Sequence, residues 1–591
     1  MSLAPSLATQ SALLPLPVVI PICGAVAAPL LARVSRHLPV IISLAALAGS
    51  ALILLLISPT VFGGQVLVHY LGGWGPVHAT VLGVGFACDP FGLLFALAAS
   101  AIGMLLLCYT LSELGGLGPG ELGGYACLFQ LLIAALIGGA LTADLFNLFV
   151  WFEVAALASY GLTGFFLERP IALEATFKIL VLTTTASFLV FLGAGMLYSG
   201  HGALNFGQLH YALAGRPSTA DRIALALLVS GFATKAGLVP FHGWLADAHT
   251  AAPGPVSALF SGLMVNFGVL SIARLVYQVY GPDVVSVRAV LVVLGVVSAL
   301  LGAVLALAQD DLKRLLAYDT VSQIGVLMIG LGSGKAAGVA GATYHLLNHA
   351  LFKSLLFLSA GAIVHSTGKT NLSDLGGLAR RRPLLAAAFL LGIASIAGIP
   401  PFNGYVSLSL IHQGLLEDHQ YGTLGLMVVA QLITIAALGR AGWLAFFRRR
   451  ERDYPELKAL RPAMIGAFVA LAGCCLVFGV LPRMLLDRLM APAASGLLHA
   501  DSYAASVLHP TPGRGVVLPP MDIHFEYAQP SELLLITVSI LGASALVWWY
   551  LRKPEPRLVG MLRAAHTGSV QDYTAYLIIG LLAMSMALTL G

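Results

Sequence analysis

The sequence predicts an all-α membrane protein that crosses the bilayer about sixteen times. Of its 591 residues, 58% are hydrophobic and only 10% are charged, whereas an ordinary soluble domain carries about 25% charged residues. Apolar runs long enough to span a bilayer, which takes about 20 residues, recur along the whole chain. A short motif containing proline and glycine also occurs twice, inside two of these runs, and indicates an internal repeat.

The predicted spans are the apolar runs bounded by glycine, proline or charged residues. They are residues 12–32, 38–57, 90–110, 124–142, 145–166, 171–198, 222–241, 255–279, 285–307, 315–333, 338–365, 383–411, 424–447, 463–482, 531–551 and 572–590. The long connection 483–530 is expected to hold a short surface helix. Because the number of spans is even, both termini are expected on the same side of the membrane.

Alternate loops differ strongly in their basic residues, and this difference orients the chain. Nineteen of the 31 Lys and Arg residues fall in one set of loops, at 33–36, 169, 313–314, 369–382, 448–461 and 552–563. Loops that face the cytoplasm are enriched in Lys and Arg. We therefore predict a multi-pass protein of the cell inner (plasma) membrane whose two termini both lie outside.

The repeated motif reads AGLVPFHGW at 236–244 and AGIPPFNGY at 397–405, with five identical positions. Each copy falls in the fourth of five consecutive spans, one set within 124–279 and the other within 285–447. Because five is odd, the second set starts on the opposite side of the membrane, so the two sets are predicted to be inverted repeats. The residues before and after them, 1–123 and 448–591, supply further spans, and the latter also supplies the long outer loop.

Pro240, Pro400 and Pro401 are predicted to break their helices, because proline lacks the backbone N–H of a helical hydrogen bond. The freed carbonyls then need water or side-chain partners, which favours a position beside a buried or hydrated cavity. We interpret the two breaks as the floors of two half-channels. The alternative is a pair of proline kinks used only for packing.

Several ionisable residues lie inside predicted spans, where a charge costs about 2.5–3.5 kcal/mol on insertion scales. Glu153, Lys178 and Lys235 lie in three of the five spans of the first set. His345, His349 and Lys353 follow one another at intervals of four, so they share one helix face at about 6 Å spacing. That spacing suits a row of proton-transfer groups joined by water. The alternatives are a buried Glu153–Lys235 pair that only neutralises two charges, and core histidines.

The first break is flanked by two more histidines. His242 and His249 either line a channel or hold the loop together with Asp247. The six cysteines are scattered and form no C-x-x-C, so no iron–sulfur or zinc site is predicted. Haem is disfavoured because His345 and His349 lie on one helix. We therefore expect neither a metal nor a cofactor on this chain.

Three stretches, TKAGLVPFHGWLADAHTAAPGPVSALFSG, DDLKRLLAYDTVSQIGVLMIGLG and HLLNHALFKSLLFLSAGAIVHSTGKTNLSDLGGLARR, resemble one membrane-protein family. It comprises the antiporter-like subunits of respiratory complex I (L, M and N), of Mrp sodium/proton antiporters (D), and of formate hydrogenlyase-type energy-converting hydrogenases. The resemblance covers about residues 85–450. It implies fourteen core helices in two inverted five-helix units with broken seventh and twelfth helices.

The resemblance also implies roles for individual residues. Glu153 and Lys235 match the glutamate and lysine on the family's fifth and seventh helices, and His345, His349 and Lys353 match its central polar row. Three positions depart from the family pattern: Asn266 stands where the family usually has Lys, Leu408 where it has Lys or Glu, and Asp319 where it has Ser or His. Asn cannot carry a proton, so Asn266, like Asp319, is predicted to line the channel.

The predicted function is proton translocation by an antiporter-like subunit of a larger membrane complex. His412, one turn beyond Leu408, is the predicted substitute for the missing exit group, because i and i+4 share a helix face. The expected partners are other membrane subunits, the lipid bilayer, and protons or sodium ions, with no nucleic acid. The alternatives are a degenerate structural subunit that no longer conducts, and an ion-coupling subunit of a complex without redox chemistry.

Overall fold

The computed structural model describes residues 6–78, 80–113, 116–166, 168–214, 217–281, 285–449, 454, 457–509, 516–552, 557–566 and 568–590. Within these ranges the chain is mostly helical. Parts of two basic loops that the sequence places in the cytoplasm, residues 450–453, 455–456 and 553–556, lie outside the described residues.

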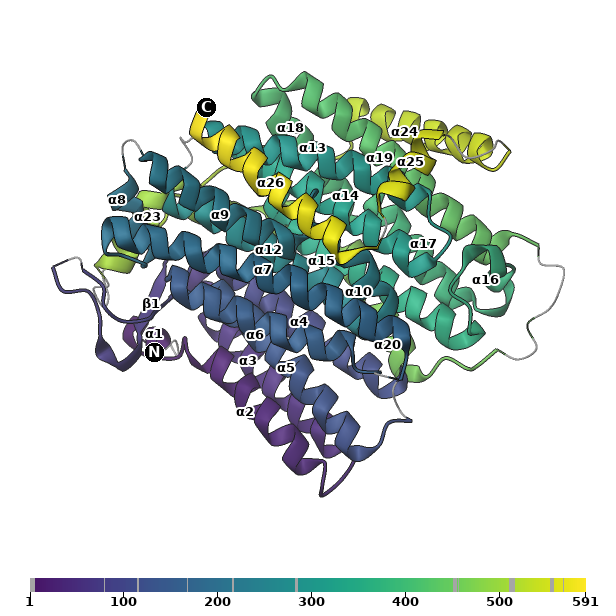
Figure 1. Cartoon of the computed structure of the whole chain (residues 1–591), viewed down its shortest axis with the longest axis horizontal. Helices are drawn as coiled ribbons and strands as arrows, with labels where there is room; N and C mark the ends of the chain where they lie inside the picture. The colour runs from purple at the N-terminus through teal and green to yellow at the C-terminus, as the bar shows by residue number, and fades with distance from the viewer. Residues whose placement is uncertain are drawn as a thin grey trace.

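The long helices of the first half of the chain lie side by side in one bundle (Figure 1). The first part of the chain forms α1 (Leu7–Ala12), α2 (Leu16–Leu31), α3 (Leu38–Phe62), β1 (Leu67–Tyr70), η1 (Leu71–Gly73), β2 (Gly85–Cys88) and α4 (Pro90–Glu113). The next part forms α5 (Pro119–Leu141), α6 (Leu145–Thr163), α7 (Pro170–His201), α8 (Phe206–Leu213), α9 (Thr219–Ala236), α10 (Leu245–Ala251), α11 (Gly254–Leu259), η2 (Phe260–Met264), α12 (Val265–Ala273) and η3 (Arg274–Val279).

The second half of the chain packs beside the first. It forms α13 (Val285–Leu307), α14 (Leu312–Gly332), α15 (Ala336–Thr367), η4 (Leu372–Asp374), α16 (Leu378–Arg381), α17 (Pro383–Ile396), α18 (Asn403–Glu417), α19 (Tyr421–Gly442) and η5 (Trp443–Phe447). The last part forms α20 (Pro462–Val480), α21 (Pro482–Leu485), η6 (Leu486–Met490), α22 (Ala491–Leu498), α23 (Ala500–Leu508), α24 (Pro530–Tyr550), α25 (Arg557–Ala565) and α26 (Val570–Leu590).

The predicted number of membrane spans is confirmed. Among the described residues, 14 helical runs are long and apolar enough to cross a membrane. Two more crossings are interrupted at the proline motifs, where α9 is followed by α10 and α17 by α18. The sequence places the starts of α14 and α9 three residues too late, because Asp311 and Ser218 cap these helices ahead of the apolar run. The protein is therefore a multi-pass membrane protein.

The two predicted sets of loops gather at opposite ends of the bundle. At one end a β-bridge joins Asp311 to Asn371, and at the other a β-bridge joins Gln65 to Val517. Figure 1 shows β1, α8 and α23 at the left end and α16 at the right. We call the end that carries the Lys- and Arg-rich loops the basic end, and the other the far end. The far end also holds the hairpin of β1 and β2 and three short helices, α21 to α23, where one surface helix is expected.

The two five-span units repeat the same local structure. The third helices, α7 and α15, have 32 residues each. Asp144 caps the second helix of the first unit and Asp311 caps that of the second. Each aspartate also pairs in a β-bridge with an asparagine that follows the third helix, Asn205 or Asn371. The first bridge lies at the far end and the second at the basic end, which supports an inverted relation between the units.

Both proline motifs break their helices with the same backbone geometry. Gly237 and Gly398 end the preceding helices with φ angles of 74° and 69°, in the left-handed region that glycine enters without a steric cost. The next residues, Leu238 and Ile399, each donate their N–H to the carbonyl five residues earlier, at 3.0 Å. The repeated sequence therefore encodes a repeated break.

A side chain binds a backbone carbonyl at each break, and in the second break this carbonyl is the one freed by Pro401. In the first break, Trp244 Nε1 donates to the carbonyl of Thr234 at 2.7 Å. In the second, Gln431 Nε2 from α19 donates to the carbonyl of Ala397 at 3.3 Å. These bonds are needed because an unsatisfied carbonyl costs several kcal/mol in hydrocarbon.

A buried ion pair ties the first unit to the flanking helices. Arg274 Nη2 donates to Asp89 Oδ1 and to the carbonyl of Ala140, both at 2.7 Å. Gln278 Nε2 donates to the second oxygen of Asp89 at 2.9 Å. Neither Arg274 nor Asp89 is exposed. The network thus joins the start of α4 to α5 and η3.

Replacing Arg274 with Met should lower the free energy of unfolding by about 3–5 kcal/mol, because it leaves Asp89 as an uncompensated buried charge. The matched control is Lys335→Ala, which removes a partly exposed pair with Asp418 at 3.4 Å and should change stability by less than about 1 kcal/mol. Thermal unfolding of both variants in detergent measures the difference. Equal midpoints would contradict this assignment.

Candidate functional site

The first candidate group lies directly before the first break. Lys235 is in the last turn of α9 and is fully buried. Its Nζ lies 5.0 Å from the centroid of the Phe152 ring, a cation–π distance. Glu153, the next residue on α6, is close enough to act electrostatically on Lys235. Within the described part of the chain, neither Lys235 Nζ nor Glu153 Oε1 has a hydrogen-bond partner, so the two are neighbours without a direct ion pair.

The second group lies in the middle of α15. Lys353 forms an ion pair with Asp319 of α14, and neither side chain is exposed. Lys353 also donates to the carbonyl of Leu316 at 3.2 Å. The sequence indicates Asp319 only as a channel-lining residue, whereas the structure makes it the counter-ion of Lys353. The pair compensates two charges that would be costly alone.

The predicted row of polar groups continues along α15 from Lys353 towards the far end. His349 is fully buried, and neither of its ring nitrogens has a partner among the described residues. His345 hydrogen bonds to Gln323 at 3.1 Å and to Ser407 at 3.0 Å. Because Ser407 belongs to α18, His345 connects the row on α15 to the helix that follows the second break.

Asn266 lies between the two groups. Its Nδ2 donates to the carbonyl of Gly262 at 2.8 Å and to the carbonyl of Leu346 on α15 at 3.0 Å. Two residues on, Gly268 packs directly against the backbone of Phe232 and Ala236, beside Lys235. Asn266 is therefore on the helix between Lys235 and α15, and its side chain is bonded to backbone rather than to an ionisable group.

Lys178 does not belong to the buried row. It pairs with Asp247 at 2.8 Å and with Glu174 at 2.5 Å. Arg314 also approaches Asp247, at 3.5 Å. The interpretation in which Asp247 holds the loop through His242 and His249 is therefore wrong. His242 instead contacts His566, with the two Nε2 atoms 2.9 Å apart, beside a cavity of about 340 Å³ at the basic end.

A second cavity at the basic end approaches the α15 row. His249 is fully buried and stacks on Phe357 with the ring centroids 4.6 Å apart. Lys353 and Lys313 both lie close enough to act on His249 electrostatically. The residues that follow His249 line a cavity of about 640 Å³, together with Glu113, Arg169, Lys313 and Lys458, among others. We call this cavity the basic vestibule.

At the far end, Leu408 and His412 face different surroundings. Leu408 packs in an apolar cluster whose other buried members are Ala299, Val326, Ile329, Ile411, Leu415, Met427 and Ala430. His412 is buried, and its Nδ1 lies 3.0 Å from a carboxylate oxygen of Glu532 on α24. Glu532 and Ser409 line a polar cavity of about 250 Å³. His412 is thus paired with Glu532, a partner on another helix that the sequence does not indicate.

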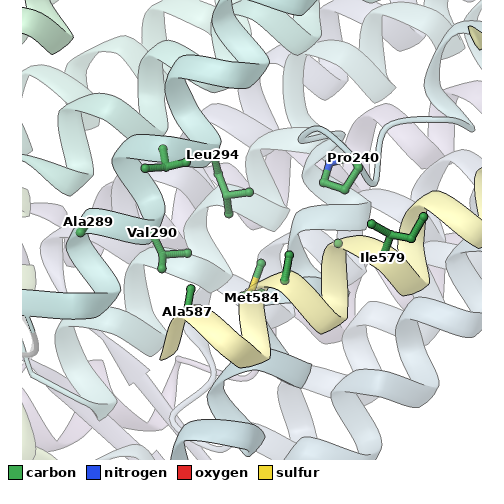
Figure 2. Close-up of a pocket in the computed structure, with 10 residues that line it drawn as sticks. Pro240, Ala289, Val290, Leu294, Ile579, Met584 and Ala587 are labelled. Atoms are coloured by element: carbon green, nitrogen blue, oxygen red, sulfur yellow. The ribbon is translucent and has the colours of Figure 1, made fainter. Parts of the chain in front are cut away.

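An apolar pocket of about 660 Å³ lies beside the first break. Figure 2 shows Pro240 at its edge, with Val290 and Leu294 of α13 on one wall and Ile579 and Met584 of α26 on the other. All ten residues that line it are apolar or glycine. The pocket therefore offers no group that transfers protons.

Three contacts at these sites are not predictable from the sequence. Asp319 is indicated as a channel residue, but its partner Lys353 lies 34 residues away on another helix. Glu532 resembles an ordinary acidic residue in the first turn of a helix. His566 lies in a short connection between α25 and α26. No local pattern marks these contacts, because each group acts through a partner distant in sequence.

Comparison with known proteins identifies the family. The sequence profile described as NADH:quinone oxidoreductase/Mrp antiporter, TM, matches residues 142–434. NADH-quinone oxidoreductase subunit N of Desulforudis audaxviator is 35% identical over 470 residues, which are 76% of this chain and 89% of that protein. The chain belongs to the NADH:quinone oxidoreductase/Mrp antiporter family.

Other members of this family resemble the chain over nearly their full length. A Na(+)/H(+) antiporter subunit of Bacillus subtilis is 29% identical over 83% of this chain and 98% of its own. A chain of the membrane-bound sulfane sulfur reductase, an archaeal respiratory membrane complex, superposes with a TM-score of 0.76 and 27% identity, covering 84% of this chain and 99% of that one. The family resemblance seen in the sequence motifs is confirmed.

The Asp319–Lys353 pair gives a double-mutant test. Asp319→Ala should destabilise the protein by about 3–5 kcal/mol, because it leaves the Lys353 ammonium buried and unpaired. The double variant Asp319→Ala with Lys353→Met should recover most of that loss, because no charge remains. Thermal unfolding in detergent measures both. If the double variant loses as much as the sum of the single variants, the two side chains are not coupled.

Proposed function

We propose that this chain translocates protons as the antiporter-like subunit of a multisubunit membrane complex of the complex I or Mrp type. Its relatives are named as subunits of an NADH-quinone oxidoreductase and of a Na(+)/H(+) antiporter. These names support other membrane subunits as partners. The transported ion is then a proton, with sodium as the alternative for an Mrp-type partner.

The observation that carries the proposal is the set of fully buried ionisable groups inside the bundle. Lys235, His345, His349 and Lys353 are each 0% exposed. Burying such groups is expensive, and those in membrane spans commonly mark ion paths. Lys235 and His349 also lack hydrogen-bond partners among the described residues, which supports water or a transferred proton as their partner.

The proposed path enters at the basic end and leaves at the far end. The proton passes from Lys235 and Glu153 in the first half-channel, beside Asn266, which is bonded to the Leu346 carbonyl on α15, to Lys353 in the second half-channel. From Lys353 the proton passes along α15 to His345 and Ser407, and leaves through His412 and Glu532. An imidazole can accept a proton on one ring nitrogen and release one from the other, which suits the transfers at His345 and His412. We place the basic end in the cytoplasm, following the distribution of Lys and Arg.

A structural subunit that no longer conducts is the second candidate. Two observations favour it: Asn266 is bonded to backbone carbonyls, and Leu408 sits in an apolar cluster. In this alternative the family fold remains and the connection between the half-channels is lost. Proton flux decides between the two candidates.

Lys235→Ala should reduce proton flux through the reconstituted complex by at least about tenfold, because it removes the ammonium that holds and releases the proton in the first half-channel. Assembly should survive, because Lys235 makes no ion pair that the fold depends on. The control for the flux measurement is Lys335→Ala, which changes a partly exposed residue. Undiminished flux in Lys235→Ala would remove Lys235 from the path.

His412→Phe and Glu532→Gln should each lower flux by at least about tenfold, because each breaks the exit pair at a different member. Leu408→Lys should leave the parent flux in place, since the exit already exists. Proton flux into vesicles measures all three variants. If Leu408→Lys creates flux where the parent has none, the parent is the structural subunit.

A further inference from the structure

His242 and His566 form a pair that links the first break to the C-terminal segment. Their Nε2 atoms lie 2.9 Å apart, so one nitrogen carries a proton and the other accepts it. His566 Nδ1 lies 2.8 Å from the carbonyl of Leu562, which can only accept. His566 Nδ1 is therefore the protonated nitrogen of that ring, and its Nε2 accepts. It follows that His242 Nε2 carries the shared proton.

This assignment leaves His242 Nδ1 as a free acceptor on the buried side of the pair. The atom is buried and has no hydrogen-bond partner in the described ranges. His566 is half-buried, and it lines the 340 Å³ cavity of the basic end together with Lys178, Asp247 and Arg314. That volume accommodates several water molecules at about 30 Å³ each. His242 is therefore buried inside the protein, whereas His566 borders the cavity of the basic end.

The C-terminal segment packs closely against the first break, and this packing places His566 beside His242. A Cβ added at Gly580 would come within 2.4 Å of the Pro240 ring, and one added at Gly243 within 2.4 Å of the Tyr573 ring. Figure 2 shows α26 running beside Pro240. His566, in the connection that precedes α26, lies outside residues 142–434, which match the family profile.

We propose that His242 and His566 form the proton gate of the first half-channel, with His566 supplied by the C-terminal segment as its water-facing member. The proposal rests on the proposed function and adds a residue to it. A proton that reaches His242 Nδ1 makes the pair cationic, and the shared proton then passes to His566 Nε2. When the rings separate, His566 gives this proton to water in the cavity and returns neutral, and His242, left with its proton on Nδ1, exchanges it for one on Nε2 through water, which restores the resting pair. Uptake, the direction in which the proposed path runs at the basic end, is the same sequence in reverse and begins with the exchange of the His242 proton from Nε2 to Nδ1.

The charges around His566 suit this role. Burial lowers the pKa of His566, the hydrogen bond to Leu562 opposes that effect, and the Arg314 guanidinium lowers the pKa further. The other titratable groups nearby are Lys178 and Glu174 on α7, Asp247 on α10, Tyr318 on α14 and Tyr573 on α26. Lys178, Arg314, Glu174 and Asp247 form ion pairs with one another. Because its pKa is lowered, His566 favours the neutral state and readily gives up the proton.

The first test measures proton flux in vesicles that contain the whole complex. His566→Phe should lower flux at least about tenfold, while the control His37→Phe, an exposed residue before α3, should leave it unchanged. In His566→Ala, added imidazole should restore flux, whereas His566→Phe leaves no room for it. Flux in His566→Phe within about twofold of the parent, or no rescue of His566→Ala, would overturn the gate.

The second test does not depend on conduction. Nitrogen-15 NMR of histidine-labelled protein should report a proton on Nε2 of His242 and on Nδ1 of His566, with signals assigned by His242→Phe and His566→Phe. A proton on Nδ1 of His242 at neutral pH would overturn the gate.

The variant Lys235→Ala separates the gate from the proposed function. If flux is lost in Lys235→Ala but intact in His566→Phe, the gate alone is refuted. If the parent complex shows no proton flux, the proposed function is refuted, and the histidine tautomers measured by NMR then show whether the hydrogen-bonded His242–His566 pair exists.

Discussion

The cost of placing charge and unsatisfied backbone in hydrocarbon governs this structure. A helix interrupted inside a membrane must have its free carbonyls bound, and a buried charge must have a partner or a task. At the breaks, Trp244 and Gln431 contribute to the first demand, because their side chains donate to the carbonyls of Thr234 and Ala397. Asp89 with Arg274, and Asp319 with Lys353, meet the second as fully buried pairs. Among the described residues, Lys235 and His349 have no hydrogen-bond partner, and the proposed path joins them to paired groups such as Lys353 and His412.

The number and order of the spans follow from the apolar runs along the sequence, and the repeat follows from the duplicated proline motif. Apolar runs long enough to span a bilayer predict about sixteen crossings, because a water-soluble protein could not bury so many long apolar segments. The duplicated proline motif predicts two equal breaks, since proline and a nearby left-handed glycine act locally. Capped helix starts such as Asp311 are less visible, because a cap is polar and lies ahead of the apolar run. The β1–β2 hairpin was not predicted at all, because each strand has only four residues.

Within one helix the candidate site is predictable from spacing: the row His345, His349 and Lys353 is visible because residues four apart share a face. Across helices only Glu153 and Lys235 are related, through the family resemblance. Other partners are not visible in the sequence, which indicates Asp319 without its lysine and does not indicate Glu532 or His566. The loop role given to Asp247 was wrong because its partner Lys178 lies 69 residues away. Departures from the family at Asn266 and Leu408 are easy to recognise, whereas the contact of Glu532 with His412 is visible only in the structure, where the start of α24 reaches α18.

The central claim is that buried groups connect the two faces of the bundle for protons. The most direct measurement is proton uptake by vesicles that contain the complete parent complex, driven by a potassium diffusion potential in sodium-free buffer. If the path conducts, uptake should be well above that of protein-free vesicles, with the rate set by the imposed potential. Uptake no faster than in protein-free vesicles would contradict the claim, and would leave the chain as a membrane scaffold that has kept the family fold without its conduction.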